Sequence, residues 1–251
     1  MTHARFGYEL KLFRMRKPAS DRRGINRSAR AWQGLAAVTC ILIAAASARA
    51  DEYSKISRHS ARMFSTGTLV VDSRMGDVTV EGWDEPRVEV EAEKVVRAGS
   101  EEKARPLYSR VRVELVGEDK LVTLRALFPP RRPWRPFRGE SKLSVNFRIK
   151  MPFDANLKLA CVDGDVRITG IAGGELLRIN YGDVEIDVPD IYQLRSLFAH
   201  AWVGYVESDL TGMASDGSGL QQKVSFYNPY GTQDISVRVR MGGVFIYRGD
   251  D

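Results

Sequence analysis

Apolar and polar residues alternate with a period of two over much of the chain after residue 66, which is typical of half-buried β-strands. The clearest run covers 87–96, where the valines fall on one face and the charged residues on the other. Shorter runs of this kind lie at 68–74, 77–81, 110–116, 120–127 and 141–151. The runs at 68–74 and 77–81 are expected to pair as one hairpin, and those at 110–116 and 120–127 as another. One helical turn is expected at 100–105, with Ser100 as its N-cap.

A short phrase, Gly-Asp-Val-x-Val/Ile, returns along the chain. Strict copies begin at Gly76, Gly164 and Gly182, and looser copies begin at Gly204 and Gly242. From the second copy onward the spacings are 18, 22 and 38 residues, the last being about two units. A phrase repeated at this spacing indicates structural units that stack on one another.

The residues around each glycine indicate a sharp bend. Apolar residues stand three and five positions before the glycine and two and four positions after it, as Cys161 and Val166 do around Gly164. These two sets have opposite parity, so a straight strand would point them to opposite faces. The backbone is therefore expected to bend at Gly-Asp, where Gly adopts positive φ and Asp bonds its own turn. The turn residues predicted in this way are Gly76, Asp77, Gly164, Asp165, Gly182, Asp183 and Gly242.

Two folds accommodate such bends. In a β-solenoid of single-stranded β-helix-like character, each bend is a corner of one coil and successive coils stack. In an antiparallel β-sandwich, Gly-Asp is instead a two-residue hairpin turn. The repeat period favours the solenoid. The predicted fold is therefore all-β, with N-terminal antiparallel hairpins over 66–155, stacked solenoid repeats over 156–247, and the sandwich as the alternative.

The first fifty residues differ from the rest. A basic stretch at 5–30 precedes an apolar run at 35–46 and the sequence Ala48-Arg49-Ala50, which is the layout of a secretory signal peptide cleaved near Ala50. Met15 would make a more ordinary start than Met1. The apolar run is shorter than the ~20 residues that span a bilayer, so no transmembrane span is expected in the mature chain. Residues 51–65 are expected to be a flexible mature N-terminus, and the location periplasmic, extracellular or outer-envelope.

Removal of the leader changes the charge. The whole chain is +6, but residues 1–50 hold ten of the 38 basic residues and two of the 32 acidic ones. The remaining 28 basic and 30 acidic residues give a mature chain near −2. A nucleic-acid partner is therefore not expected. One cysteine, Cys161, remains after cleavage, so no intramolecular disulfide can form.

An arginine- and proline-rich loop at 128–139 interrupts the strands, and its four prolines exclude a central strand. Its candidate binding residues are Arg131, Arg132, Trp134, Arg135, Phe137 and Arg138. Arginine makes bidentate contacts to phosphate and carboxylate groups, and aromatic rings add stacking. The loop is therefore predicted to bind an anionic envelope partner, namely a lipid head group, lipopolysaccharide or an acidic protein. The structural alternative is a solvated loop whose Trp134 covers a sheet edge.

Other candidate groups have structural explanations. Cys161 occupies a position that is apolar in the other copies, which predicts a core residue rather than a nucleophile. His200 occupies an outward position and has no second His at ligand spacing. A row of carboxylates could serve glycoside hydrolysis, and it comprises Asp163, Asp165, Asp183, Glu185 and Asp187. The bend explains Asp165 and Asp183 without chemistry, so no catalytic residue, cofactor or metal is predicted.

Residues 66–247 resemble the bacterial putative-adhesin domain family of exported proteins. The resemblance rests on Gly67-Thr-Leu-Val-Val, on Gly76-Asp-Val-Thr-Val with Trp83 and Arg87-Val-Glu-Val, on Ile149-Lys-Met-Pro and Leu157-Lys-Leu, and on the Gly-Asp-Val copies. It implies an all-β array of stacked strands with solenoid character. The family has no agreed catalytic residues, so the resemblance assigns none here.

These observations predict an exported, non-enzymatic, adhesin-like binding or structural protein of the cell envelope. Repeated units give a long surface suited to an extended partner. Two alternatives remain at this stage: a secreted enzyme that acts on polysaccharide through the carboxylate row, and a periplasmic sensing domain that acts through a partner protein.

Overall fold

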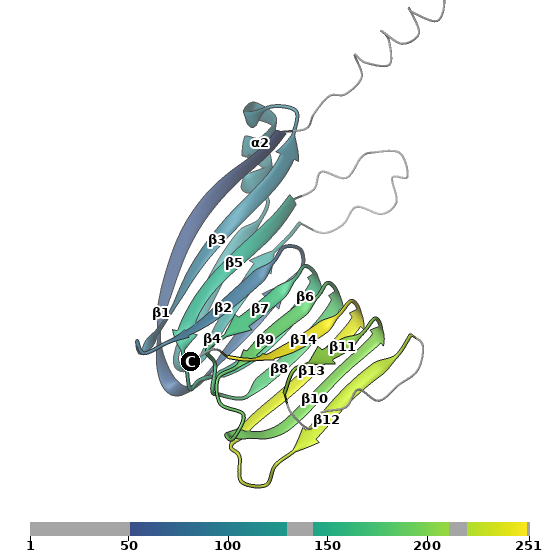
Figure 1. Ribbon diagram of the computed structural model, residues 1–251. Helices are drawn as coiled ribbons and strands as arrows, with labels where there is room; N and C mark the ends of the chain where they lie inside the picture. Colours follow the sequence, from purple (N-terminus) through teal and green to yellow (C-terminus); the bar gives the residue numbers. More distant parts are fainter. Residues whose placement is uncertain (1–50, 130–142, 211–219, 250–251) are drawn as a thin grey trace, which may run out of the picture. The chain divides into compact units, whose positions relative to one another are not determined.

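The computed structural model describes residues 51–129, 143–210 and 220–249, which lie in one compact unit, Arg49–Asp251 (Figure 1). The predicted signal peptide lies outside these residues. In chain order the elements are β1 (Asp51–Ser73), β2 (Val78–Trp83), β3 (Arg87–Ala98), α2 (Glu101–Tyr108), β4 (Arg112–Leu127), β5 (Leu143–Pro152), β6 (Asn156–Asp163), β7 (Val166–Thr169), β8 (Glu175–Tyr181), β9 (Val184–Val188), β10 (Leu194–Val203), β11 (Val206–Ser208), β12 (Gln222–Tyr227), β13 (Gln233–Met241) and β14 (Val244–Arg248).

The strands form one mixed sheet. Thirteen strands follow the order β11-β14-β9-β7-β2-β5-β3-β1-β6-β8-β13-β10-β12, and β4 pairs with β1 beside this path. The long strand β1 joins the two halves, since residues 51–62 pair with β3 and residues 68–73 pair with β4 and β6. The edge strands β11 and β12 meet through a hydrogen bond of 2.9 Å from Val206 N to Gln222 Oε1. The sheet therefore nearly closes on itself.

The predicted β-solenoid is wrong, although the all-β class holds. In a solenoid, consecutive coils stack in chain order. Here the copies of the repeated phrase lie in the order Gly76, Gly164, Gly182, Gly242 and Gly204, so the last two are exchanged. In addition, β3 is antiparallel to both β1 and β5 within the same sheet. The N-terminal strands therefore continue the sheet of the repeats, and the expected hairpin of β1 with β2 does not form because β2 pairs with β5 and β7.

Equivalent residues of the copies form aligned rows in the core. Val78, Val166, Val184, Val244 and Val206 are successive partners in one ladder. All five side chains are at most 5% exposed. Burial of each such side chain contributes roughly 1.5–3 kcal/mol, so a copy is stable only when its neighbours cover it.

Each copy bends between its two strands, for example between β6 and β7 (Figure 1). The bend glycines Gly76, Gly164, Gly182, Gly204 and Gly242 have φ between 115° and 151°, a region that favours glycine. The apolar positions before and after the bend are both buried, as Cys161 and Val166 illustrate. The strands on either side of a bend do not pair with each other, which excludes a hairpin turn at Gly-Asp.

The N-terminal part differs in detail from the expectation. Residues 51–65, expected to be flexible, form the first part of β1. The expected helical turn is confirmed as α2, which follows Ser100 as N-cap, although the Ser100 side chain makes no capping hydrogen bond. Residues 112–127 form one element, β4, with positive φ at Gly117 and Asp119, where a turn was expected. Within the described ranges, no helix has the length and apolar character needed to cross a membrane.

Candidate binding face

The carboxylates at the bends connect neighbouring copies. Asp77 Oδ1 accepts a hydrogen bond from the backbone N–H of Asp165 at 3.0 Å, and Asp165 Oδ1 accepts one from Asp183 at 2.9 Å. Asp183 Oδ1 in turn accepts from the backbone N–H of Gly243 at 2.7 Å. Each Asp thus bonds the next bend, whereas the sequence predicted a bond to its own. These three carboxylates stabilise the stacking of the copies and need no catalytic role to explain them.

The other carboxylates of the predicted row are dispersed. Asp163 is exposed at the end of β6, and Glu185 Oε2 accepts a hydrogen bond from Arg167 Nε at 2.9 Å. Asp187 lines a cavity of about 610 Å³ together with Asp209, which accepts a hydrogen bond from a backbone N–H of β14. No cluster of three or more His, Cys, Asp or Glu residues that could hold a metal ion occurs in the part of the chain that the structure describes.

Cys161 is a core residue. It is 2% exposed, and burial raises the pKa of its thiol to about 11. The thiol is therefore protonated at neutral pH and is a poor nucleophile. His200 is half-buried on the outward side of β10, where its Nε2 lies 2.8 Å from Gln221 Nε2. It is not close to Cys161 in the sheet, since their side chains lie on opposite faces.

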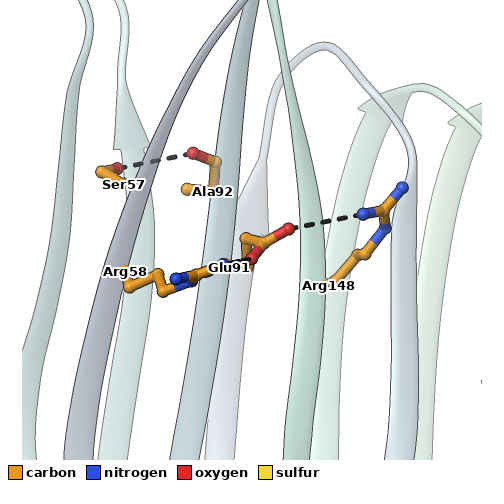
Figure 2. Close-up of polar contacts among 5 residues, drawn as sticks. All are labelled: Ser57, Arg58, Glu91, Ala92 and Arg148. Carbon is orange, nitrogen blue, oxygen red and sulfur yellow. Dashed lines mark hydrogen bonds and ion pairs between the residues drawn. The ribbon is translucent and has the colours of Figure 1, made fainter.

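Several charges on the outer side of β1, β3 and β5 are paired. Glu91 on β3 lies between two arginines, with Oε2 3.0 Å from Arg58 Nη2 on β1 and Oε1 3.3 Å from Arg148 Nη1 on β5 (Figure 2). Lys150 Nζ lies 3.5 Å from Glu81 Oε2 on the neighbouring strand β2. Cross-strand pairs of opposite charge stabilise a sheet, so this face has a structural explanation.

A second surface carries a further group of cations. We call it the basic face, and it consists of outward side chains on five adjacent strands, β6, β8, β13, β10 and β12. Its cations are Lys158, Arg178, Arg238, Arg240 and Lys223. Arg178 and Arg238 are direct Cα partners in neighbouring parallel strands. No described carboxylate lies within 4.0 Å of Lys158, Arg178, Arg238 or Arg240.

Aromatic side chains lie along the same surface. Phe198, His200 and Trp202 are successive outward residues of β10, and their ring centroids are 6.1 and 5.5 Å apart. The Arg238 guanidinium lies over the Phe198 ring at 5.7 Å. Trp202 is 60% exposed at the end of this row and leaves its ring available to a partner.

A groove of about 690 Å³ crosses β6, β8, β13 and β10 on the basic face. Its lining combines the cations Lys158 and Arg238, the apolar side chains Leu176 and Phe198, and the hydroxyl groups of Ser196 and Ser236. Two carboxylates belong to the lining: Asp234, whose pKa is lowered by its hydrogen bond to Arg195, and Glu175, whose side chain is buried. Lys158 and Arg238 have no carboxylate partner among the described residues, so they determine the charge that a ligand in the groove would meet.

The loop predicted to bind an anion lies outside the described residues, together with Arg131, Arg132, Trp134, Arg135, Phe137 and Arg138. The basic face is a separate surface that the sequence did not identify as a site. Its signal was nevertheless present, because Arg178, His200 and Arg238 occupy the same position, four residues before the bend glycine. The adjacency of Arg178 and Arg238 depends on the exchanged order of the last two copies, which local sequence does not show.

Glu175 and Gln233 form a buried polar pair that the sequence did not indicate. Glu175 is 3% exposed and lies in the row that Leu157 and Ile235 continue. Its Oε1 accepts a hydrogen bond from Gln233 Nε2 at 3.4 Å, whereas Oε2 has no partner. Burial raises the pKa of Glu175 to about 8. Its position seven residues before Gly182 is apolar in the other copies, so the alignment of the copies already marked it as inward.

No protein-family model and no curated protein sequence matches this chain. Solved structures do match it. Its structural neighbours are bacterial putative adhesins and cell adhesion proteins. A putative cell adhesion protein from Clostridium sporogenes matches with 12% identity over 79% of this chain and all of its own, with a TM-score of 0.48. A putative adhesin from Parabacteroides distasonis matches with 11% identity over 79% of this chain and 98% of its own, with a TM-score of 0.22. One from Bacteroides fragilis matches with 12% identity over 77% and 97%, with a TM-score of 0.23.

Proposed function

We propose that this protein is an exported, non-enzymatic binding module of the cell envelope, and that the basic face binds an anionic polysaccharide chain. The observation that carries the proposal is the direct pairing of Arg178 with Arg238 without a neutralising carboxylate among the described residues. Like charges placed opposite each other destabilise a sheet. A partner of opposite charge would remove this cost.

Protection of a sheet edge does not explain these arginines. Charged residues commonly discourage edge strands from pairing with other chains. However, β8 lies between β6 and β13, and β13 lies between β8 and β10, so Arg178 and Arg238 are on interior strands. The charged face around Glu91 shows that the same sheet pairs its charges elsewhere. The contrast supports a binding role for the basic face.

The groove favours a polysaccharide among anionic partners. Sugar rings present hydroxyl groups and an apolar C–H face, and acidic sugars add carboxylates. In the groove, Ser196 and Ser236 can bond the hydroxyl groups, and Leu176 and Phe198 can pack against the C–H face. Lys158 and Arg238 can pair with the carboxylates. Because the groove crosses four strands, a linear chain can lie across the sheet.

The enzyme alternative has less support. Asp165 and Asp183 accept hydrogen bonds from neighbouring bends, so the row of carboxylates is part of the fold. A glycosidase requires two carboxyl groups that flank the scissile bond. The lining of the groove on the basic face includes two carboxylates. Asp234 is bonded to Arg195 and Ser196, and Glu175 lies in the buried row of Leu157 and Ile235, so the two do not flank a ligand together.

The double variant Arg178→Ser/Arg238→Ser is expected to weaken binding to alginate, a polymer of uronic acids, by at least about tenfold. Each arginine would otherwise donate charge-assisted hydrogen bonds to a carboxylate, worth roughly 1.5–3 kcal/mol in favourable cases. The dissociation constant is measured by isothermal titration calorimetry at fixed salt.

The matched control is Arg58→Ser/Arg148→Ser, which removes the same charge from the paired face. It should change the dissociation constant by less than about twofold, since both arginines lie outside the basic face. Equal weakening by both double variants would reduce the effect to net charge and overturn the proposal. Absence of binding by the unmodified protein would do the same.

A further inference from the structure

A second cationic site lies at the other end of β1, away from the strands of the basic face. A cavity of about 680 Å³ is bounded by β1, β3, the start of β4 and α2. Lys55 of β1 and Lys94 of β3 both line it, and the two residues are direct Cα partners in the antiparallel ladder. Directly opposed residues of an antiparallel pair lie on the same face of the sheet, with Cβ atoms about 5 Å apart.

The two lysines lack acidic partners. Lys94 Nζ donates one hydrogen bond of 2.7 Å to the carbonyl oxygen of Val111, which leaves its other N–H groups available. Neither Lys55 nor Lys94 forms an ion pair with a described residue. Among the described residues that line the cavity, Glu101 is the one carboxylate, and its Oε1 forms an ion pair with Arg105 Nη2 at 3.3 Å.

The electrostatic surroundings agree with this geometry. The pKa of Lys94 is lowered, first because burial disfavours its charged form and then because Lys55 repels it. A cation placed beside another cation and partly removed from water costs stability. The hydrogen bond to the Val111 carbonyl oxygen offsets part of this cost, but no described carboxylate neutralises either lysine.

We infer that Lys55 and Lys94 bind a phosphoryl group in the cavity between β1, β3 and α2. Two ammonium groups match the charge of about −2 that a phosphate monoester carries, and its three oxygens accept several hydrogen bonds. Lysine is an established point-charge partner for phosphate. Tyr53 and Tyr108 also line the cavity and add hydroxyl donors. The cavity exceeds the volume of one phosphate, so the group can be attached to a larger molecule.

The first test uses inorganic phosphate and sn-glycerol 3-phosphate as probes, with sodium chloride at matched ionic strength as the reference. A ligand that binds the folded state raises the melting temperature with its concentration. We expect both probes to stabilise the protein beyond the salt reference. Lys55→Gln should raise the dissociation constant for either probe at least about tenfold. Lys103→Gln, which removes an exposed cation of α2 that does not line the cavity, should leave it unchanged.

A second readout separates binding from folding. Without any phosphate, Lys55→Gln should melt at the same temperature as the unmodified protein or higher, because the substitution relieves the repulsion of Lys94. Vesicles that contain phosphatidic acid distinguish the source of the phosphoryl group, and Lys55-dependent capture by vesicles or by glycerol phosphate supports the inference. If neither the vesicles nor glycerol phosphate bind, or if Lys55→Gln and Lys103→Gln weaken binding equally, the inference of a phosphoryl site is overturned. The proposal for the basic face is unaffected by either result.

Discussion

Gly182→Ala is expected to destabilise the protein by about 3 kcal/mol or more. Gly182 has a φ of 129°, where a side chain costs roughly 1–3 kcal/mol of strain. A Cβ atom at this position would also lie 2.2 Å from the carbonyl oxygen of Gly164, a backbone atom of the adjacent bend. Relief of that contact requires β6 and β8 to separate where they pair. The melting temperature should therefore fall by roughly 6–12 °C, at about 2–4 °C per kcal/mol for a chain of this size.

The matched control is Gly99→Ala. Gly99 has ordinary φ, and a Cβ atom there would meet nothing within 4 Å. Surface changes without a structural role usually stay within about 0.5 kcal/mol. Urea unfolding of both variants gives the comparison, with midpoints read at unchanged slope. Equal midpoints for Gly182→Ala and Gly99→Ala would show that the bends do not require glycine.

Glu175→Gln is expected to remove a pH dependence of several kcal/mol. The folded protein keeps the proton on Glu175 up to a pKa of about 8, whereas the unfolded chain releases it near the ordinary value of 4.5. Between these values the folded state holds more protons, so the free energy of unfolding decreases as pH rises, by about 1.4 kcal/mol per unit. Below pH 4.5 the stabilisation is fully present, and above about 8 it is lost and the curve levels off.

The measurement is urea unfolding of the unmodified protein and Glu175→Gln at pH 5, 6.5 and 8. The stability of the variant relative to the unmodified protein should increase steadily across this series. Glu118→Gln, a change at an exposed carboxylate of β4, should follow the unmodified protein at every pH. A constant difference between Glu175→Gln and the unmodified protein would mean that Glu175 does not titrate between pH 5 and 8.

The repeated phrase predicted the local structure of the bends well. Glycine with Asp after it, and apolar residues whose parity changes across it, are local signals, and the structure has positive φ at Gly164 with Cys161 and Val166 both buried. The alternation of valines and charges likewise located β3, because period two follows directly from strand geometry.

The stacking order of the copies was not predictable in the same way. The copies at Gly204 and Gly242 have similar local sequences, and their exchange depends on which side chains pack together across strands. This exchange determines the candidate site. In chain order, Arg178 would have His200 as its outward neighbour, but in the sheet Arg238 lies between them. The groove and the adjacency of Arg178 and Arg238 thus arise from tertiary contacts between segments about 60 residues apart.

Backbone chemical-shift mapping by NMR shows whether an anionic polysaccharide binds at the basic face. Alginate oligosaccharides are titrated into the isotope-labelled protein, and the amide shifts are assigned to strands. Binding at the basic face predicts that the largest changes fall on β8, β13 and β10 around Arg178, Arg238 and Phe198, with little change around Glu91 on β3. Changes centred on β1, β3 and β5, or no changes at saturating oligosaccharide, would show that the basic face does not bind the polysaccharide.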